Sequence, residues 1–358
     1  NMRKLITTFI LIFSFFLSSQ EPLFTLVDNS KTGINFSNEL VDTKEHSIFL
    51  YANYYGGAGV GIGDFDNDGL EDIFFAANLL DDKIYKNLGN FEFEDKTKMS
   101  GIINNGSWST GVTVADVNND GLLDIYVSCE LYDDAPVLRR NKLYINQGSF
   151  KFKESASEWG VDVDRRTRHS VFFDYNKDGL LDLYLLNHPP NTGNFSPFFG
   201  KDMSLPEYNL QLFENKGNHF VDVTESAGLN RSGFPNAAVI GDFNKDGWPD
   251  IYVANDFDSP DFLYFNNKDK TFTYATETSL RHTSFYSMGV DAADINNDSH
   301  LDLMVLDMTA EDNFRLKSNM SGMNPDSFWK VVNDGGHYQY MFNTLQLNNG
   351  NDTFSDIA

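Results

Sequence analysis

The sequence contains a single cysteine, Cys129, so it can form no intrachain disulfide and no thiolate metal site. Basic residues are also scarce: 27 Lys and Arg stand against 52 Asp and Glu, which gives a formal net charge of −25. Nucleic-acid binding needs a basic surface, so we expect no nucleic-acid partner. A transmembrane helix needs ~20 consecutive apolar residues, and no run reaches that length, so we predict no transmembrane span in the mature chain.

The N-terminus is typical of a secretory signal. Arg3 and Lys4 precede a largely apolar run from Leu5 to Leu17, and the small polar segment 18–20 follows it. We therefore assign residues 1–20 to a signal peptide and predict a secreted or cell-surface protein; an uncleaved membrane anchor is the alternative. No cysteine follows the run, so the sequence offers no lipoprotein attachment site.

Against these absences stands one abundant feature, the nine-residue pattern Asp-x-Asp/Asn-x-Asp-(Gly)-x-x-Asp. It begins at Asp64, Asp116, Asp174, Asp242 and Asp294. If such a loop curls tightly, the side-chain oxygens at positions 1, 3, 5 and 9 turn toward one point. Hard cations such as Ca²⁺ take 6–8 oxygen ligands, and glycine at position 6 permits the positive φ of a sharp turn. The pattern therefore predicts up to five Ca²⁺ sites; an acidic turn without metal is the alternative.

The predicted ligands are the residues at positions 1, 3, 5, 7 and 9, with position 7 contributing its backbone carbonyl. They are Asp64, Asp66, Asp68, Leu70, Asp72, Asp116, Asn118, Asp120, Leu122, Asp124, Asp174, Asn176, Asp178, Leu180, Asp182, Asp242, Asn244, Asp246, Trp248, Asp250, Asp294, Asn296, Asp298, His300 and Asp302. Asp66 gives the first loop one more carboxylate than the others, so we expect it to bind Ca²⁺ most tightly. In the fifth loop Ser299 replaces the turn glycine, so we expect the site at 294–302 to be weak or empty.

The EF-hand is the main competing interpretation of this pattern. It requires a bidentate Glu at position 12 and flanking helices. Position 12 here is Phe75, Val127, Leu185, Val253 and Val305, which are residues typical of strands. The EF-hand therefore fails on both requirements.

The residues around each loop repeat as well. Small residues precede four of the loops, and β-branched or aromatic runs follow all of them. A third run ends at an Asn, namely Asn87, Asn146, Asn215, Asn266 and Asn348, and a fourth run follows at 91–93, 150–152, 220–223, 271–274 and 353–357. Four strands per unit predict an all-β fold of β-propeller blades, in which small residues suit the crowded innermost strand. Each metal loop then joins strands one and two of its blade.

These units resemble the FG-GAP/VCBS repeats of integrin-α-type β-propellers over roughly residues 55–358. The run Gly-Val-x-Ile-Gly-Asp-Phe-Asp-Asn-Asp-Gly at 59–69, with Trp-Ser-Thr-Gly-Val at 108–112 and Leu-Asp-Met-Thr-Ala-Glu-Asp-Asn at 306–313, resembles secreted ASPIC/UnbV-type proteins. That group is similar to the cartilage acidic protein family. The resemblance implies a seven-bladed, calcium-loaded extracellular propeller with poorly defined binding roles and no established catalysis.

The repeats fill most of the mature chain, which we assign to one incomplete propeller over residues 21–358 with insertions at 187–208 and 309–340. Five blades do not close a seven-bladed ring, so we expect an N-terminal fragment with a possible missing C-terminal domain. A closed five-bladed ring is the alternative. The segment Leu23–Val27 resembles a lone fourth strand that would complete a later blade.

The sequence contains no recognised catalytic motif, and its histidines are scattered. We therefore predict a binding or adhesion module for an extracellular glycan or protein, and not an enzyme. Exposed aromatics of the insertions, such as Trp329 and Tyr338, would contact that partner; packing over blade edges is the alternative. The other function considered is a polysaccharide-active, lyase-like enzyme. Its candidate cluster is Arg165, Arg166, Arg168 and His169, for which salt bridges with neighbouring acids are the simpler role.

Overall fold

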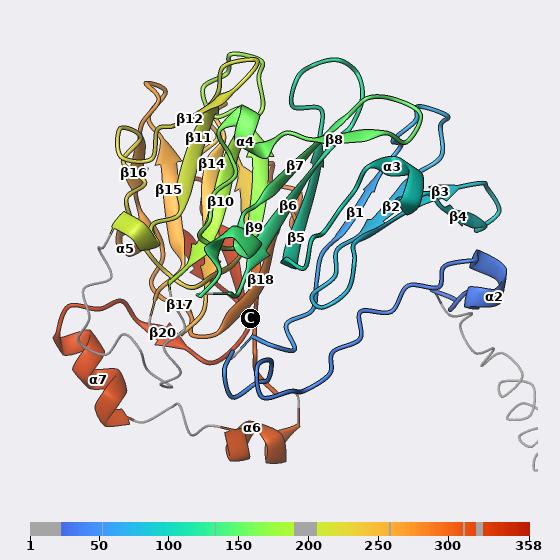
Figure 1. The fold of residues 1–358 in the computed structure, drawn as a ribbon. Coiled ribbons are helices and arrows are strands. Elements are labelled where there is room, and N and C mark those ends of the chain that lie inside the picture. The colour runs from blue at the N-terminus through green and yellow to red at the C-terminus, as the bar shows by residue number, and fades with distance from the viewer. Residues whose placement is uncertain are drawn as a thin grey trace, which may run out of the picture.

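The computed structural model describes residues 23–51, 53–132, 134–189, 206–257, 259–310, 312–319 and 325–358 (Figure 1). The predicted signal peptide at 1–20 and most of the first insertion lie outside the described residues. Five four-stranded antiparallel sheets dominate the described part of the chain, and in each the strand order follows the sequence. We call each of these sheets, with its connecting loops, a blade.

The strands of the five blades have the following bounds. They are β1 (Val60–Gly63), β2 (Asp72–Phe75), β3 (Lys83–Asn87) and β4 (Phe93–Asp95) in blade 1; β5 (Trp108–Ala115), β6 (Asp124–Glu130), β7 (Lys142–Asn146) and β8 (Phe152–Glu154) in blade 2; β9 (Arg166–Phe173), β10 (Asp182–His188), β11 (Gln211–Asn215) and β12 (Phe220–Asp222) in blade 3; β13 (Pro235–Gly241), β14 (Asp250–Asn255), β15 (Phe262–Asn266) and β16 (Phe272–Tyr274) in blade 4; and β18 (Ser287–Ala293), β19 (Asp302–Asp307), β21 (Thr344–Asn348) and β22 (Phe354–Asp356) in blade 5.

The four-stranded unit and the placement of each acidic loop between strands one and two are confirmed. In blade 1, for example, Gly63 pairs with Asp72 at the two ends of the first loop. The fourth strands of blades 1 and 2 begin later than expected, at Phe93 and Phe152. Phe91 and Phe150, which the sequence pattern assigned to those strands, lie in the preceding turns at φ values of 62° and 57°.

The inner strands of neighbouring blades approach each other too closely for large side chains. A Cβ added to Gly61 of β1 would lie 2.7 Å from Cγ1 of Val112 in β5, and one added to Gly59 would lie 2.6 Å from the backbone N of Val112. The small residues before the first loop are therefore required by the blade-to-blade contact, as the propeller interpretation predicted, whereas Gly289 in the corresponding strand of blade 5 has open space around it. The main hydrophobic clusters lie between blades: Phe74 and Ile84 of blade 1 pack with Ile125 and Val127 of blade 2.

A short helical turn follows the fourth strand in several blades, a feature that the sequence did not predict. These turns are α3 (Thr97–Ser100), α4 (Ala156–Trp159) and α5 (Thr276–Ser279). After α3 the chain reverses at Gly101, whose φ is 84° and whose Cβ, if present, would lie 2.6 Å from the carbonyl oxygen of Phe152 in the next blade. Only glycine fits so close an approach at a positive φ.

The N-terminal segment ends in the same kind of turn but lacks the strand expected before it. Helix α2 (Asn29–Thr32) leads into Gly33, which packs against the carbonyl of Phe93 as Gly101 packs against Phe152. The prediction of a strand at Leu23–Val27 is wrong for this structure: the segment is not in a sheet, and Leu23 and Leu26 are 90% and 98% exposed. No described sheet edge lies alongside it to supply the hydrogen bonds of a strand.

The blades form an open series within the described residues. Consecutive blades pack through β1 and β5, β5 and β9, β9 and β13, and β13 and β18, whereas no comparable packing joins β18 to β1. The outer faces at the two ends remain accessible: Val60 and Ile62 of β1 are 51% and 60% exposed, and Leu306 of β19 is 49% exposed. The closed five-bladed alternative is therefore not formed by the described residues.

The connections between strands two and three lie at the end opposite to the acidic loops. The second insertion contains α6 (Asn313–Asn319), α7 (Pro325–Asn333) and β20 (Gln339–Tyr340), which Figure 1 shows below the blades. Strand β20 pairs in parallel with β17 (Thr283–Ser284), and two 3₁₀ turns, η1 (Pro136–Arg139) and η2 (Pro206–Tyr208), occupy other connections. Among the described residues, no helix has both the length and the apolar character needed to cross a membrane.

Candidate functional site

The five acidic loops share one backbone conformation, which their first aspartate organises. In the first loop Oδ1 of Asp64 accepts a hydrogen bond from the backbone N of Asp68 at 3.0 Å, and Oδ2 accepts one from Gly69 at 2.7 Å. The same pair of bonds holds Asp116, Asp174, Asp242 and Asp294. Position 5 adds a further bond, because its Oδ1 accepts from the backbone N of position 7 in every loop.

Two residues of each loop adopt the left-handed conformation. Position 6 has φ between 85° and 88° in the first four loops, where it is glycine. In the fifth loop Ser299 adopts φ of 69°, and Asn297 at position 4 has φ of 60°. The fifth loop therefore folds as the others do, with the left-handed strain carried by a serine.

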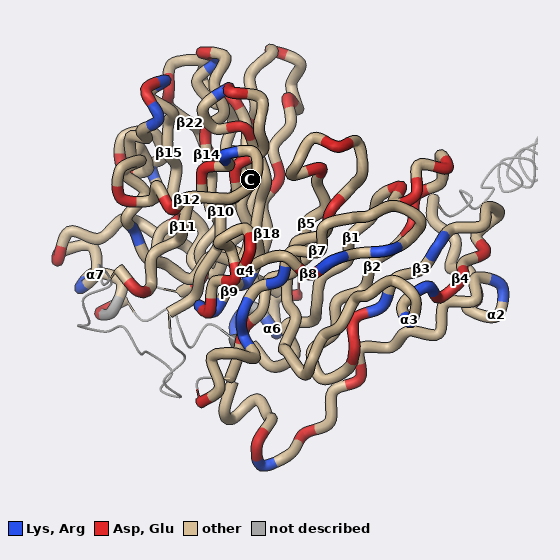
Figure 2. The backbone as a smooth tube through the Cα atoms, turned by 45° about the horizontal axis from the view of Figure 1, so that its top comes forward, with Lys and Arg blue, Asp and Glu red and all other residues tan. Residues whose placement is uncertain are grey.

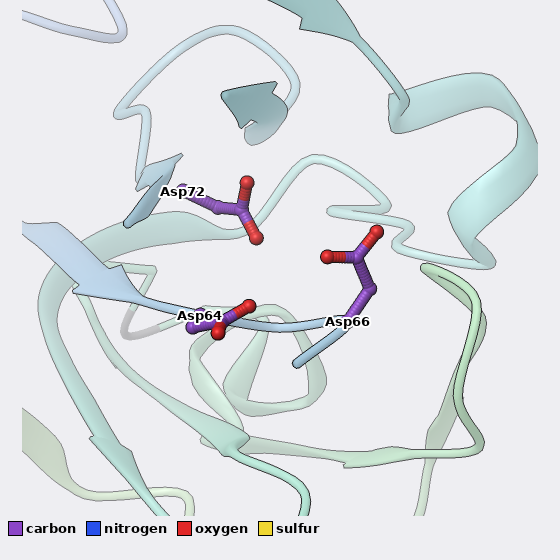
Figure 3. A group of neighbouring side chains, drawn as sticks. All are labelled: Asp64, Asp66 and Asp72. Carbon is purple, nitrogen blue, oxygen red and sulfur yellow. The ribbon is translucent and has the colours of Figure 1, made fainter. Parts of the chain in front are cut away.

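The first loop brings its carboxylates closest together. Oxygens of Asp64, Asp66 and Asp72 all lie within 4.8 Å of one another, and Figure 3 shows the three carboxylates facing a common space. Lys86, at the end of β3, donates hydrogen bonds to Asp66 and, at 2.6 Å, to Oδ2 of Asp68. An ammonium group thus lies against two of the predicted Ca²⁺ ligands. The sequence-based expectation that this loop binds Ca²⁺ most tightly did not include this positive charge.

The aspartate at position 9 is the buried member of each site. Asp72 accepts from the backbone N of Phe65 at 2.9 Å and from that of Asn87 at 2.8 Å. Burial raises its pKa to about 6, while the two backbone hydrogen bonds oppose that rise. Burial likewise raises the pKa of the equivalent residues to about 7, namely Asp124, Asp182 and Asp250.

Neighbouring loops touch at the same end of the blades. The side-chain amide of Asn67 donates to the carbonyl of Gly121 at 2.9 Å, and that of Asn119 to the carbonyl of Gly179 at 3.4 Å. Lys177 continues the series by donating to the carbonyl of Gly247. Figure 2 shows acidic residues in the hairpins at this end of the sheets. Each loop gathers carboxylate, amide and backbone carbonyl oxygens. These are the ligands that a hard cation takes, so the residues present fit Ca²⁺.

A second polar site lies at the opposite end of the strands. Glu130, the last residue of β6, is fully buried; its Oε2 accepts a hydrogen bond from the hydroxyl of Tyr51 at 2.5 Å and lies 3.6 Å from Nη1 of Arg168. Nδ1 of His188, the last residue of β10, lies 3.8 Å from Oε1 of Glu130. That Oε1 has no hydrogen-bond partner among the described atoms. We call Glu130, Arg168, His188, Asp256 and Asp307 the polar cluster.

Two further acids belong to the cluster through blades 4 and 5. Burial raises the pKa of Asp256 to about 7; the charge of Asp307 also raises it, and the charge of Arg168 lowers it. Asp307 accepts from the hydroxyl of Ser284 at 2.6 Å through Oδ2, while its Oδ1 has no hydrogen-bond partner among the described atoms. The cluster therefore draws on residues of four blades: Arg168 and His188 each lie within 4 Å of Glu130, and Asp256 is linked to Arg168 and Asp307 by their charges.

The sequence named only part of this cluster. Of its four candidate residues, Arg168 contacts Glu130, but Arg165 donates to the backbone carbonyls of Pro206 and Asn209, at 3.0 and 3.1 Å. His169 is partly buried, which lowers its pKa, and no acid of the described residues is paired with it. One signal could have found the rest: Glu130, His188 and Asp256 all stand six positions after the last aspartate of their loop, at the end of an apolar strand.

A family model described as an FG-GAP-like repeat matches residues 44–127, 203–253 and 242–305, which together span slightly more than half of the chain. This chain belongs to the FG-GAP-like repeat family. Cartilage acidic protein 1 of Xenopus tropicalis is 25% identical over 164 residues, covering 45% of this chain and 24% of that protein. The predicted resemblance is thereby confirmed, although the chain spans only about a quarter of this curated relative.

Solved structures with a similar arrangement are more distant. An Agrocybe aegerita lectin that recognises non-reducing terminal N-acetylglucosamine has a TM-score of 0.45 at 16% identity, over 83% of this chain and 64% of that one. The exo-β-1,3-galactanase 1,3Gal43A of Clostridium thermocellum has a TM-score of 0.38 at 9% identity, over 84% and 62%. A GH43_1 enzyme of Xanthomonas citri complexed with xylotriose has a TM-score of 0.34 at 9% identity, over 84% and 90%.

The prediction that the chain is not an enzyme is contradicted: solved structures similar to this chain include glycoside hydrolases of families GH43 and GH32, at identities of 8–10%. The prediction rested on the lack of a contiguous catalytic motif. In a bladed fold, residues from different blades can meet without forming any such motif, as the polar cluster does here. At these identities the likeness concerns the fold and assigns no substrate.

Proposed function

We propose that this protein is a secreted, calcium-binding propeller in which the metal ions hold the hairpins of neighbouring blades in register. The observation that carries the proposal is the common geometry of the five acidic loops, in which position 1 organises the turn. Each ion would be held by side-chain oxygens of positions 1, 3, 5 and 9 and the carbonyl of position 7. When bound, Ca²⁺ would neutralise carboxylates that repel one another in its absence.

Calcium binding is tested by removing bound metal with a chelator and then titrating the protein with Ca²⁺ in a calorimeter. Asp116→Ala removes the residue that shapes the second loop, and Asp162→Ala removes a partly buried acid outside the loops, which is paired with Arg140, as the matched control. We expect the first variant to lose about one equivalent of Ca²⁺ and the second to lose none. Equal stoichiometry in both variants would contradict the proposal.

On this scaffold we further propose a polysaccharide-active enzyme, which the polar cluster favours. A carboxyl whose pKa is raised toward 7, as at Asp256, is suited to donate a proton near neutral pH. Glu130 lies beside Arg168 and offers an unpartnered oxygen, as a base or a charge-stabilising group requires. Tyr51 and Trp108 pack edge to face beside it, at a centroid distance of 5.8 Å.

The enzyme proposal is tested by measuring turnover of the calcium-saturated protein on a panel of neutral and uronate polysaccharides. Glu130→Gln and Asp256→Asn each preserve shape and remove a titrating group, so we expect each to lower kcat by about a hundredfold or more. His169→Ala, outside the cluster, should retain activity. Absence of turnover, combined with retention of a glycan or protein in a pull-down, would support instead a binding or adhesion module.

A further inference from the structure

The described residues contain a pocket of about 400 Å³ between the turn after blade 4 and the outermost strand of blade 5. Its walls include Glu277 and Arg281 from the segment around α5, and His337 and Tyr338 from the second insertion. Asn349 and Thr353, at the turn before β22, complete its polar lining. The volume lies in the range of small-molecule sites, roughly 300–1,000 Å³. Neither the metal loops nor the polar cluster contributes to this pocket.

His337 supplies the observation that points to a ligand. Its Nε2 is buried and has no hydrogen-bond partner among the described atoms. Burial lowers the pKa of His337, so the ring is neutral near neutral pH, although Glu277 opposes that shift. Buried polar atoms in native proteins normally have a hydrogen-bond partner, and a group placed in this pocket could supply one. A hydroxyl group can donate or accept, and it therefore satisfies either tautomer of a neutral imidazole.

The remaining walls favour an uncharged, polyhydroxylated ligand. Glu277 and Arg281 bring one charge of each sign, so the pocket attracts neither anions nor cations strongly. The side-chain amide of Asn349 donates to the hydroxyl of Thr353 at 3.0 Å, and its carbonyl oxygen accepts from Ser355 at 3.1 Å. These neutral groups can exchange hydrogen bonds with hydroxyls at little desolvation cost.

Tyr338 provides the apolar surface that a sugar ring requires. It is 40% exposed at the pocket, and its ring lies 6.2 Å from that of Phe328 in α7. Its backbone carbonyl accepts a hydrogen bond from Thr283 at 3.0 Å, which ties the insertion to blade 5. The backbone at Tyr338 is therefore held in place before any ligand arrives.

We propose that this pocket binds one neutral saccharide unit, with Tyr338 stacking on the ring and His337 bonding a hydroxyl. The inference rests on the proposed carbohydrate-directed function and adds a binding site remote from the polar cluster. It also gives the second insertion a role in recognition.

The test uses the calcium-saturated chain and a panel of methyl glycosides of neutral hexoses, N-acetylhexosamines and hexuronates. Binding is followed by saturation-transfer NMR and by the imidazole resonances of His337. We expect a neutral glycoside to bind and to shift those resonances, and we expect Tyr338→Ala and His337→Phe each to weaken binding about tenfold. Trp329→Ala is the matched control: this residue is on the same insertion and 53% exposed, but it does not line the pocket.

Binding of hexuronates alone would overturn the neutral-ligand assignment. Binding that Tyr338→Ala and His337→Phe leave unchanged, or no binding at all, would overturn the site. Melting temperature and calcium stoichiometry of each variant show whether it is folded. If glycosides fail to bind while turnover on polysaccharide persists, this inference fails and the proposed enzyme function stands. If turnover is absent while glycosides still bind, the enzyme function fails and the saccharide pocket stands.

Discussion

The side-chain amide of Asn146 in blade 2 donates a hydrogen bond of 2.9 Å to the backbone carbonyl of Phe65 in the first acidic loop. The same amide donates to the carbonyl of Leu123 in its own loop at 3.0 Å. Equivalent asparagines join blades 3, 4 and 5 to the loop of a preceding blade, through Asn215 to Val117, Asn266 to Tyr175 and Asn348 to Phe243. The repeated asparagine thus links each of blades 2 to 5 to the acidic loop of a preceding blade.

Asn146→Ala should lower the free energy of unfolding by about 1–3 kcal/mol, because it removes the side-chain donor from one buried and one partly buried carbonyl. The matched control is Asn87→Ala in blade 1, where the amide donates to Glu71 of its own loop and no preceding blade is present among the described residues. Urea unfolding of both variants measures the difference. Equal losses would show that the link between blades contributes nothing to stability.

Lys86 should weaken calcium binding at the first loop, because its ammonium group bonds to Asp66 and Asp68. We expect Lys86→Met to raise the affinity of that loop, on the order of tenfold, by removing a competing positive charge. Lys83→Met, in the same strand but paired with Asp95, is the control and should change nothing. If calorimetric titration gives identical Ca²⁺ affinities for the two variants, Lys86 does not affect calcium binding at the first loop.

The buried aspartates at position 9 predict an unusual pH dependence for the calcium-free protein. Burial raises the pKa of Asp72 to about 6 and that of Asp124 to about 7, above the ordinary value of 3.8. A carboxyl with a raised folded-state pKa favours the folded protein at low pH, and this contribution is lost as pH rises through 6 to 7. The melting temperature in chelator should therefore fall between about pH 4 and pH 7 and level off above that range.

Saturating calcium should remove much of that fall, because the ion stabilises the ionised carboxylates. Part of the fall should persist, since burial also raises the pKa of Asp261 to about 7 and this residue lies outside the loops. Thermal melts at several pH values, with and without calcium, measure both effects. A melting temperature that rises with pH in chelator would contradict the assignment.

Ser299 should limit the fifth calcium site through its backbone, since it holds φ of 69° where the other loops have glycine. Ser299→Gly relieves about 1 kcal/mol of left-handed strain and should strengthen that site roughly fivefold. The reverse change, Gly179→Ser in the third loop, should weaken binding by a similar factor. Site-resolved calcium titration by NMR distinguishes the loops. Unaltered Ca²⁺ affinity in both variants would show that the backbone conformation at position 6 does not set the affinity of the site.

The blades and the conformation of the acidic loops could be predicted from the sequence because they are local and repeated. Alternating strand patterns, turn glycines and loop aspartates recur within each unit, so every copy reinforces the same assignment. The turns after strand four escaped prediction because their requirement lies in another blade. Gly101, for example, is needed only because Phe152 of the next blade packs against it.

The polar cluster could not be predicted because its members are far apart in the chain. Glu130, His188 and Asp256 belong to blades 2, 3 and 4, and they become one site only when the blades pack side by side. Lys86 was missed for a similar reason: it is an ordinary residue of strand three until the strand pairing brings it against the first loop. The contacts themselves leave no pattern in a single sequence; only the shared position of Glu130, His188 and Asp256, six residues after the last aspartate of their loops, marks them.

The most direct test of the central claim is the number of Ca²⁺ ions bound per chain, measured by elemental analysis after equilibrium dialysis and paired with thermal melts. We expect about one ion per intact loop and a melting temperature that rises with calcium, since each site adds about 2.7 kcal/mol when free calcium exceeds its Kd a hundredfold. A protein that retains no calcium and melts at the same temperature in calcium and in chelator would contradict the account.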